Sequence, residues 1–153
     1  MTHVDEGGAA RMVDVGDKAV TRREASAESL VLMAAATIEL IRQDRLAKGD
    51  ALSVARLAGI MACKRTSELI PLCHPIRITK AEVALTIVAE GVHVESRVVA
   101  VDQTGVEMEA LTAAAVAALT LIDMVKGVER GVQIEYVRLL TKSGGRSGEW
   151  RRE

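Results

Sequence analysis

Hydrophobic residues recur along this chain at two spacings, one typical of helices and the other of strands. Residues 53–70 have the spacing i, i+3, i+4, i+7 of a helix with one apolar face. That face, which we expect to point into the core, consists of Val54, Leu57, Ala58 and Met61. Ser53 is the expected N-cap, and Pro71 stands where a helix would stop.

Strand spacing follows this helix. Residues 78–88 and 92–101 alternate between apolar and polar side chains, and Gly91 lies between the two runs. The pair therefore predicts an antiparallel hairpin. Residues 132–140 predict one more strand, and the glycine-rich residues 142–148 follow it.

A second long helix is predicted to begin at Gly105 and to end at Lys126 and Gly127. Gly127 suits the C′ position, and Lys126 suits the negative end of a helix. Apolar side chains surround this helix, so it must be covered on all sides, whereas a two-layer domain covers only one. We therefore infer an oligomer in which another subunit packs on it. The apolar positions are Leu111, Ala114, Val116, Ala117, Leu119, Leu121, Ile122 and Val125.

The N-terminal part is ambiguous. Ala, Glu and Leu dominate residues 25–36, so propensity favours a helix there, and residues 37–45 have a firmer helical pattern. A strand in this region would instead complete the order β-α-β-β-α-β. The expected fold class is therefore α+β and ferredoxin-like, with one antiparallel sheet and helices packed on one face. We expect residues 1–153 to form a single domain, with about 1–11 and 143–153 flexible.

Composition excludes several classes of function. The 153 residues are 49% apolar and 27% charged, as in an ordinary globular domain, and the net charge is -1. Neither a wide basic surface nor a set of stacking aromatic residues is present, so no nucleic-acid partner is expected. The longest apolar run is shorter than a membrane span, and the first residues do not resemble a signal peptide. Because the chain has only two cysteines, and because neither a membrane span nor a signal peptide is expected, we predict a cytoplasmic protein with free thiols.

Two groups could carry acid–base chemistry. Asp123 and Lys126 are three residues apart at the end of the apolar helix, where partial desolvation would shift their proton affinities. An ordinary surface ion pair explains the same spacing. Between Pro71 and Pro75, a stiff loop presents His74 for proton transfer or anion contact. A simple turn between helix and strand is the alternative.

Other patterns point to an anion rather than a metal. The cysteines and histidines match no paired zinc spacing, and adjacent Cys73 and His74 are expected to point apart. Basic residues at element ends would form an anionic small-molecule site if they cluster in space, and solvated surface otherwise. They are Arg22, Arg23, Lys48, Lys64, Arg65, Lys126, Lys142 and Arg146. Glu107 and Glu109 either complement the helix dipole or read the amino groups of a heterocycle.

Several strings together resemble the molybdenum cofactor biosynthesis protein C family, the cyclic pyranopterin monophosphate synthases. The resemblance runs from about Met12 to Trp150, and the order and number of the strings make it specific. The strings are Lys48-Gly49-Asp50, Ala58-Gly59-Ile60, Lys64-Arg65-Thr66, Leu69-Ile70-Pro71-Leu72-Cys73-His74-Pro75, Thr104-Gly105-Val106-Glu107-Met108-Glu109-Ala110-Leu111-Thr112, Asp123-Met124-x-Lys126, Val137-Arg138-Leu139-Leu140 and Lys142-Ser143-Gly144-Gly145.

The resemblance implies a lyase that converts (8S)-3′,8-cyclo-7,8-dihydroguanosine 5′-triphosphate into cyclic pyranopterin monophosphate and releases diphosphate, in molybdenum cofactor (molybdopterin) biosynthesis. It implies a ferredoxin-like fold with a strand, not a helix, over residues 24–32. It also implies a homohexamer, a trimer of dimers, with sites at subunit interfaces. No cofactor is expected to be required and no metal ligand is assigned, although Mg²⁺ is compatible with a triphosphate.

Matched by position, the resemblance implies catalytic roles for Asp123, Lys126 and Lys48. The substrate-binding residues that it implies are Leu72, Cys73, His74, Met108 and Glu109, with Arg23, Lys64 and Lys142 around the triphosphate. Two departures are mild: the loop after residues 78–88 is short, and Arg146 stands where a lysine is usual. Without the resemblance, a nucleotide-binding regulatory module and a purely structural oligomer remain as alternatives.

Overall fold

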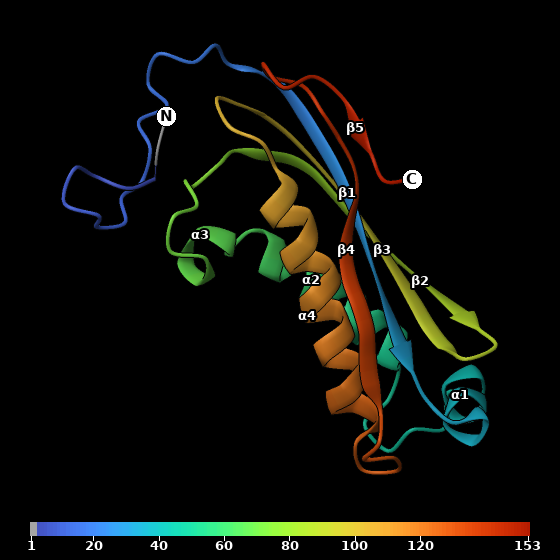
Figure 1. The fold of residues 1–153 in the computed structure, drawn as a ribbon. Coiled ribbons are helices and arrows are strands. Elements are labelled where there is room, and N and C mark those ends of the chain that lie inside the picture. Colours follow the sequence, from blue (N-terminus) through green and yellow to red (C-terminus); the bar gives the residue numbers. More distant parts are fainter. Residues whose placement is uncertain (1–2) are drawn as a thin grey trace.

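The computed structural model describes residues 3–153, and within them five strands form one sheet. The strand order is β2-β3-β1-β4-β5, and every neighbouring pair is antiparallel (Figure 1). The strands are β1 (Thr21–Leu32), β2 (Ile78–Val88), β3 (Gly91–Asp102), β4 (Gln133–Ser143) and β5 (Trp150–Arg151). The helices are α1 (Ala35–Arg42), α2 (Ala51–Cys63), α3 (Thr66–Leu69) and α4 (Glu107–Val125).

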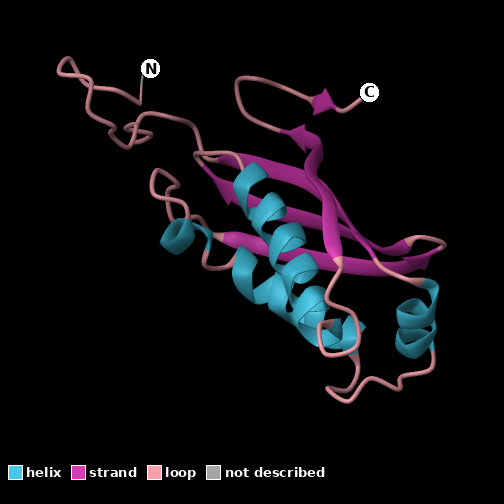
Figure 2. Cartoon of the chain, turned by 60° about the horizontal axis from the view of Figure 1, so that its bottom comes forward, coloured by secondary structure: helices cyan, strands magenta, loops and turns pink. Residues whose placement is uncertain are grey.

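The arrangement confirms the predicted α+β class. Leaving aside the short elements, the chain runs β1-α2-β2-β3-α4-β4, which is the ferredoxin-like order. Helices α2 and α4 lie side by side on the same face of the sheet (Figure 2). The predicted hairpin is present, with Val88 paired to Gly91 across its turn.

Strand β1 replaces the helix that propensity alone favours for residues 25–36, and it confirms the strand over residues 24–32 that the resemblance implies. The segment is the central strand, paired with β3 on one side and β4 on the other. Its small buried residues, such as Ala25 and Ala27, face the helices, and the Ser29 hydroxyl donates to the Ala114 carbonyl at 3.0 Å. Helix propensity is a weak preference, and two rows of strand pairing with a buried face outweigh it here.

Helix α2 begins two residues earlier than predicted and ends at Cys63. Its N-cap is Asp50, whose carboxylate accepts a hydrogen bond from the Ser53 backbone N–H at 3.0 Å, so the assignment of Ser53 as the cap was wrong. The predicted helix is also divided. The backbone of Arg65, with φ -115° and ψ 15°, departs from helical geometry and separates α2 from the single turn of α3.

The predicted apolar stripe of α2 does not face the core. Helix α2 instead packs its small residues, among them Ala55 and Gly59, against α4. A Cβ atom at Gly59 would lie only 2.8 Å from the Ala113 carbonyl oxygen, so the two helices approach closely at this point. Periodicity identifies an apolar face but not its partner. The large side chains of the stripe are exposed in this chain: Val54 by 42%, Leu57 by 61% and Met61 by 52%.

Helix α4 is the central helix of the domain. It is long and apolar enough to cross a membrane, yet 56% of its apolar window is buried inside this chain, as in the core helix of a domain. Leu119 on its outer side is 56% exposed. Gly127 follows the C-cap and therefore occupies the predicted C′ position, although it is not among the described glycines with positive φ. Lys126 occupies the C-cap in right-handed helical geometry.

Candidate active site

Two adjacent cavities surround the N-terminal end of α4. Their volumes are about 600 and 470 Å³. Both are lined by Lys18, Thr104, Gly105 and Glu107, so they form the two halves of one groove. We call the larger half the cationic cavity and the smaller half the strip cavity. The N-terminal segment lies against this groove, because Val13 and Val15 line the strip cavity.

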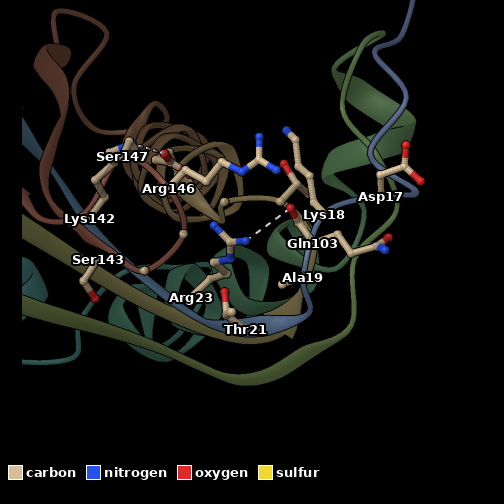
Figure 3. A pocket seen from close by; sticks show the side chains of 15 residues that line it. Asp17, Lys18, Ala19, Thr21, Arg23, Gln103, Lys142, Ser143, Arg146 and Ser147 are labelled. Atoms are coloured by element: carbon tan, nitrogen blue, oxygen red, sulfur yellow. Dashed lines mark hydrogen bonds and ion pairs between the residues drawn. The ribbon is translucent and has the colours of Figure 1, made fainter. Parts of the chain in front are cut away.

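The cationic cavity collects positive charge from three separate segments of the chain. Its charged lining consists of Lys18, Arg23, Lys142 and Arg146 together with the carboxylates of Asp17 and Glu107. Figure 3 shows the nitrogen ends of Lys18, Arg23 and Arg146 pointing into the same hollow. Guanidinium and ammonium groups gathered in this way suit an anion with several oxygens, such as a chain of phosphates.

Two cations of this cavity, Arg23 and Lys142, are held by polar contacts. The Arg23 side chain is buried, and its Nε and Nη2 atoms donate to the carbonyls of Asp102 and Gln103, both at 3.3 Å. The Lys142 ammonium lies 3.3 Å from the Glu107 carboxylate and donates to the Ser147 hydroxyl at 2.7 Å. Strand β1 supplies Arg23 and strand β4 supplies Lys142, so the sheet fixes the distance between them.

The strip cavity holds the second group of predicted site residues. It is lined by Leu72, Cys73, His74, Met108 and Glu109. Burial raises the pKa of Glu109 to about 7, and the Glu107 carboxylate adds to that rise. Burial also raises the pKa of the Cys73 thiol. At neutral pH this cavity therefore offers a protonated thiol and a carboxyl group that both donates and accepts protons.

A third cluster lies at the other end of α4. Asp123 forms ion pairs with Lys126 at 2.7 Å and with Lys48 at 2.8 Å. The Lys48 ammonium also donates to the Asp123 carbonyl oxygen at 2.8 Å. These two lysines lower the pKa of Asp123 to about 2. The carboxylate is therefore ionised throughout the neutral range, and two cations lie beside it.

The expected desolvation of the Asp123–Lys126 pair is absent within a single chain. Their side chains are 53% and 60% exposed. This expectation was wrong for one subunit because Asp123 and Lys126 lie on the solvent side of the helix end, whereas Met124 and Val125 on its other side are buried in the core. Solvent reaches all three members of the cluster, including Lys48.

The predicted site residues consequently fall into two places. Glu109 and Asp123 are fourteen residues apart on one helix, which corresponds to about 21 Å along its axis. The structure brings Lys48, Asp123 and Lys126 together, and it brings His74 to the opposite end beside Glu109. Lys64, the C-cap of α2, lines neither cavity of the groove.

Sequence reasoning missed Lys18, which lines both cavities. It lies in an irregular segment before β1, and neither spacing nor a repeated pattern distinguishes it from other surface lysines. The alternation of the preceding residues 12–15 was the available signal, because it indicated that this segment docks on the domain. Among residues 3–153, no three His, Cys, Asp or Glu side chains gather as metal ligands would.

The fold and the groove define a class of protein: a ferredoxin-like α+β domain with a cationic cavity next to a cavity with a titratable carboxyl group. Residues 12–145 match the model of the MoaC family, and the chain belongs to this family. It is 56% identical to a cyclic pyranopterin monophosphate synthase of Thermomicrobium roseum, over all of this chain and 93% of that protein. It is 58% identical to the cyclic pyranopterin monophosphate synthase of Parvibaculum lavamentivorans, over 99% of this chain and 96% of that protein.

Proposed function

We propose that this chain is a cyclic pyranopterin monophosphate synthase. It converts (8S)-3′,8-cyclo-7,8-dihydroguanosine 5′-triphosphate into cyclic pyranopterin monophosphate and diphosphate, a step of molybdenum cofactor biosynthesis. The observation that carries the proposal is the groove at the start of α4, in which a cationic cavity adjoins a cavity with a titratable carboxyl group. Identities above 50% to curated synthases along nearly the full chain support it.

The two cavities suggest how the substrate is oriented. Arg23 and Lys142, together with Lys18, hold the triphosphate in the cationic cavity. Leaving diphosphate develops negative charge as its bond breaks, and fixed cations stabilise that charge. The resemblance to the family also implies that Lys64 binds the triphosphate. Because it lies outside the groove of its own chain, we assign it to the site of a neighbouring subunit.

The other end of the substrate fits the strip cavity. Leu72, Cys73 and Met108 offer apolar contact to the heterocycle, while His74 and Glu109 offer polar contact. Opening the purine ring and closing the pterin ring require several proton transfers. A carboxyl group with a pKa of about 7 is suited to them because its two protonation states are both populated at neutral pH.

The catalytic trio is Asp123, Lys126 and Lys48. The two ammonium groups share one carboxylate and are therefore held in fixed positions, from which each can deliver a proton to a substrate atom. Within one chain, this trio and the groove lie at opposite ends of α4. We therefore propose that the trio of one subunit completes the groove of another, within a homohexamer built as a trimer of dimers.

Exposed apolar side chains on the helical layer support this assembly. Val54, Leu57 and Met61 on α2 and Leu119 on α4 are large, apolar and at least 42% exposed. Exposed apolar patches are typical of protein–protein interfaces. In a two-fold dimer that packs α4 against its symmetry mate in antiparallel orientation, the start of one α4 meets the end of the other. We further propose that the protein acts in the cytoplasm.

The test is incubation of the purified protein with the cyclised triphosphate. We expect release of diphosphate and a pterin that fluoresces after oxidation, and we expect both to persist in excess EDTA because the lysines and arginines supply the positive charge. Loss of turnover on chelation would instead assign part of that charge to Mg²⁺. Binding of the triphosphate without diphosphate release would indicate a regulatory module.

The matched variants are Lys126→Ala and Lys80→Ala. Both remove an exposed lysine that is paired with a carboxylate, but Lys80 pairs with Glu82 on the edge strand β2, away from either cavity. We expect Lys126→Ala to retain the oligomer and lose turnover by at least about a hundredfold, the usual scale for a proton-transfer group. Lys80→Ala should behave as the wild type. Near-normal pterin output from Lys126→Ala would end its catalytic assignment.

A further inference from the structure

The loop after β4 lies flat on the side chain of Arg23. Gly144 and Gly145 have φ values of 94° and 75°, which residues other than glycine rarely adopt. A Cβ atom built on Gly145 would overlap Nη1 of Arg23 and would lie 2.7 Å from its Cζ atom. One built on Gly144 would overlap the carbonyl oxygen of Arg22 instead. The space that Gly145 leaves empty is therefore occupied by the guanidinium head itself.

The opposite side of this guanidinium is also occupied. Its Nε and Nη2 atoms donate to the carbonyls of Asp102 and Gln103, at the end of β3. The Arg23 head is thus held between the β3 end and the glycine loop, and Arg23 as a whole residue is only 9% exposed. The loop is closed in turn by hydrogen bonds from Lys142 to the Ser147 hydroxyl and from the Gly148 N–H to the Gly145 carbonyl.

We propose that Gly145 is a positioning residue for anion binding: the absence of its side chain lets the loop press the Arg23 guanidinium into the wall of the cationic cavity. A methyl group at position 145 would displace Nη1, and the Arg23 head would then lose its carbonyl partners or leave the cavity wall. The inference rests on the proposed function, in which Arg23 binds the triphosphate.

Gly148 provides a matched control within the same loop. Its φ is also positive, at 65°, but a Cβ atom there would meet nothing within 4 Å. Gly145→Ala and Gly148→Ala therefore introduce a similar backbone strain, and only the first introduces a clash with Arg23. A difference between them in anion affinity reports the guanidinium contact and not the general stiffness of the loop.

The experiment measures binding of inorganic triphosphate to the intact oligomer by calorimetry, across a series of salt concentrations. We expect Gly145→Ala to bind about tenfold more weakly, the scale of one lost charge-assisted hydrogen bond, with a shallower salt dependence. Gly148→Ala should stay within about twofold of the wild type. In turnover assays, Gly145→Ala should raise KM for the cyclised triphosphate more than it lowers kcat.

A second variant separates positioning from folding. Arg23→Lys keeps the charge but removes the guanidinium fork, so adding Gly145→Ala to it should weaken binding no further. Equal affinities of Gly145→Ala and Gly148→Ala, or additive losses in the double variant, would overturn the inference while leaving the proposed function intact. Failure of the wild type to bind triphosphate would remove the proposed phosphate site and the inference together.

Discussion

Two of the carboxylates on helix α4, Glu109 and Asp123, lie in opposite electrostatic environments. Glu109, in its first turn, is buried, and burial raises its pKa to about 7. Asp123, near its last turn, is exposed, and the lysines at positions 126 and 48 lower its pKa to about 2. The pKa values of these two carboxyl groups thus differ by several units, because Glu109 is buried away from water and Asp123 lies beside two ammonium groups. Such separation is the usual basis for assigning an acid and a base in an active site.

The substitution Glu109→Gln tests the buried carboxyl group. Its pKa in the folded protein lies above the ordinary value of 4.5, so the folded state binds more protons than the unfolded state between pH 4.5 and 7. The contribution of Glu109 to stability is therefore fully present below about pH 4.5 and is lost as pH rises through about 7. Each pKa unit corresponds to about 1.4 kcal/mol, so a shift from 4.5 to about 7 limits the loss by pH 8 to at most about 3.5 kcal/mol.

Thermal unfolding at pH 5 and pH 8 measures this effect. We expect the wild type to be less stable at pH 8 than at pH 5, and Glu109→Gln to show a smaller difference. The turnover of Glu109→Gln should be lower than that of the wild type at both pH values. Glu68→Gln is a control, since Glu68 lies on the short helix α3 and lines neither cavity. Identical pH dependence in the wild type and Glu109→Gln would show that the carboxyl group titrates as it does in water.

At the scale of elements, α2 approaches α4 closely. Gly59 permits that approach: a Cβ atom there would lie 2.8 Å from the Ala113 carbonyl oxygen and 3.2 Å from the side chains of Ala117 and Val83. The antiparallel pair places the start of α2 near Lys48 and Asp123, and its end near Glu109. Gly59 thus sets the spacing of two helices whose ends lie near Glu109 on one side and near the Asp123 cluster on the other.

The substitution Gly59→Val should force the two helices apart. Overpacking of a tight contact costs about 1–3 kcal/mol, and part of this is offset because glycine is a poor helix former. We expect a lower midpoint of thermal unfolding and a loss of turnover. Gly127→Val serves as the control, because no atom lies within 4 Å of its built Cβ. Equal stability of the two variants would show that α2 can shift without cost.

At the scale of the whole molecule, one chain places the proposed site residues in two separate clusters. The groove and His74 lie at one end of α4, and the lysines that pair with Asp123 lie at the other. Exposed apolar residues on the helical layer, among them Leu57 and Leu119, are a surface on which a second copy can pack. A shared site explains both observations, because association would cover this surface and bring opposite ends of two helices together.

Complementation between inactive subunits tests the shared site. His74→Ala and Lys126→Ala should each be inactive alone. When the two are co-expressed, half of the dimers are mixed, and one of the two sites in each mixed dimer is intact, so about a quarter of the wild-type rate should return. Sedimentation should show a species far above the 16.3 kDa of one chain. Absence of any recovered activity in verified mixed oligomers would place the complete site within one subunit.

Much of the fold follows from local patterns. The hairpin of β2 and β3, the long apolar helix and the last strand could be read from alternation and helical spacing, because those patterns report how side chains alternate between core and solvent. Helix propensity misled at β1, and helical spacing misled at α2. In both, the deciding contacts involve small residues, such as Ala27 and Gly59, whose hydrophobicity is too slight to mark a face.

The sequence by itself determined which chemical groups are available: lysines and arginines at element ends, a histidine between two prolines, and carboxylates on an apolar helix. Only the tertiary structure decided how they are grouped. It placed Lys18 and Arg23 in one cavity, buried Glu109 and left Asp123 in solvent. The physical reason is that distance and dielectric surroundings depend on contacts between segments far apart in the chain, and these set both the pKa values and the shape of the groove.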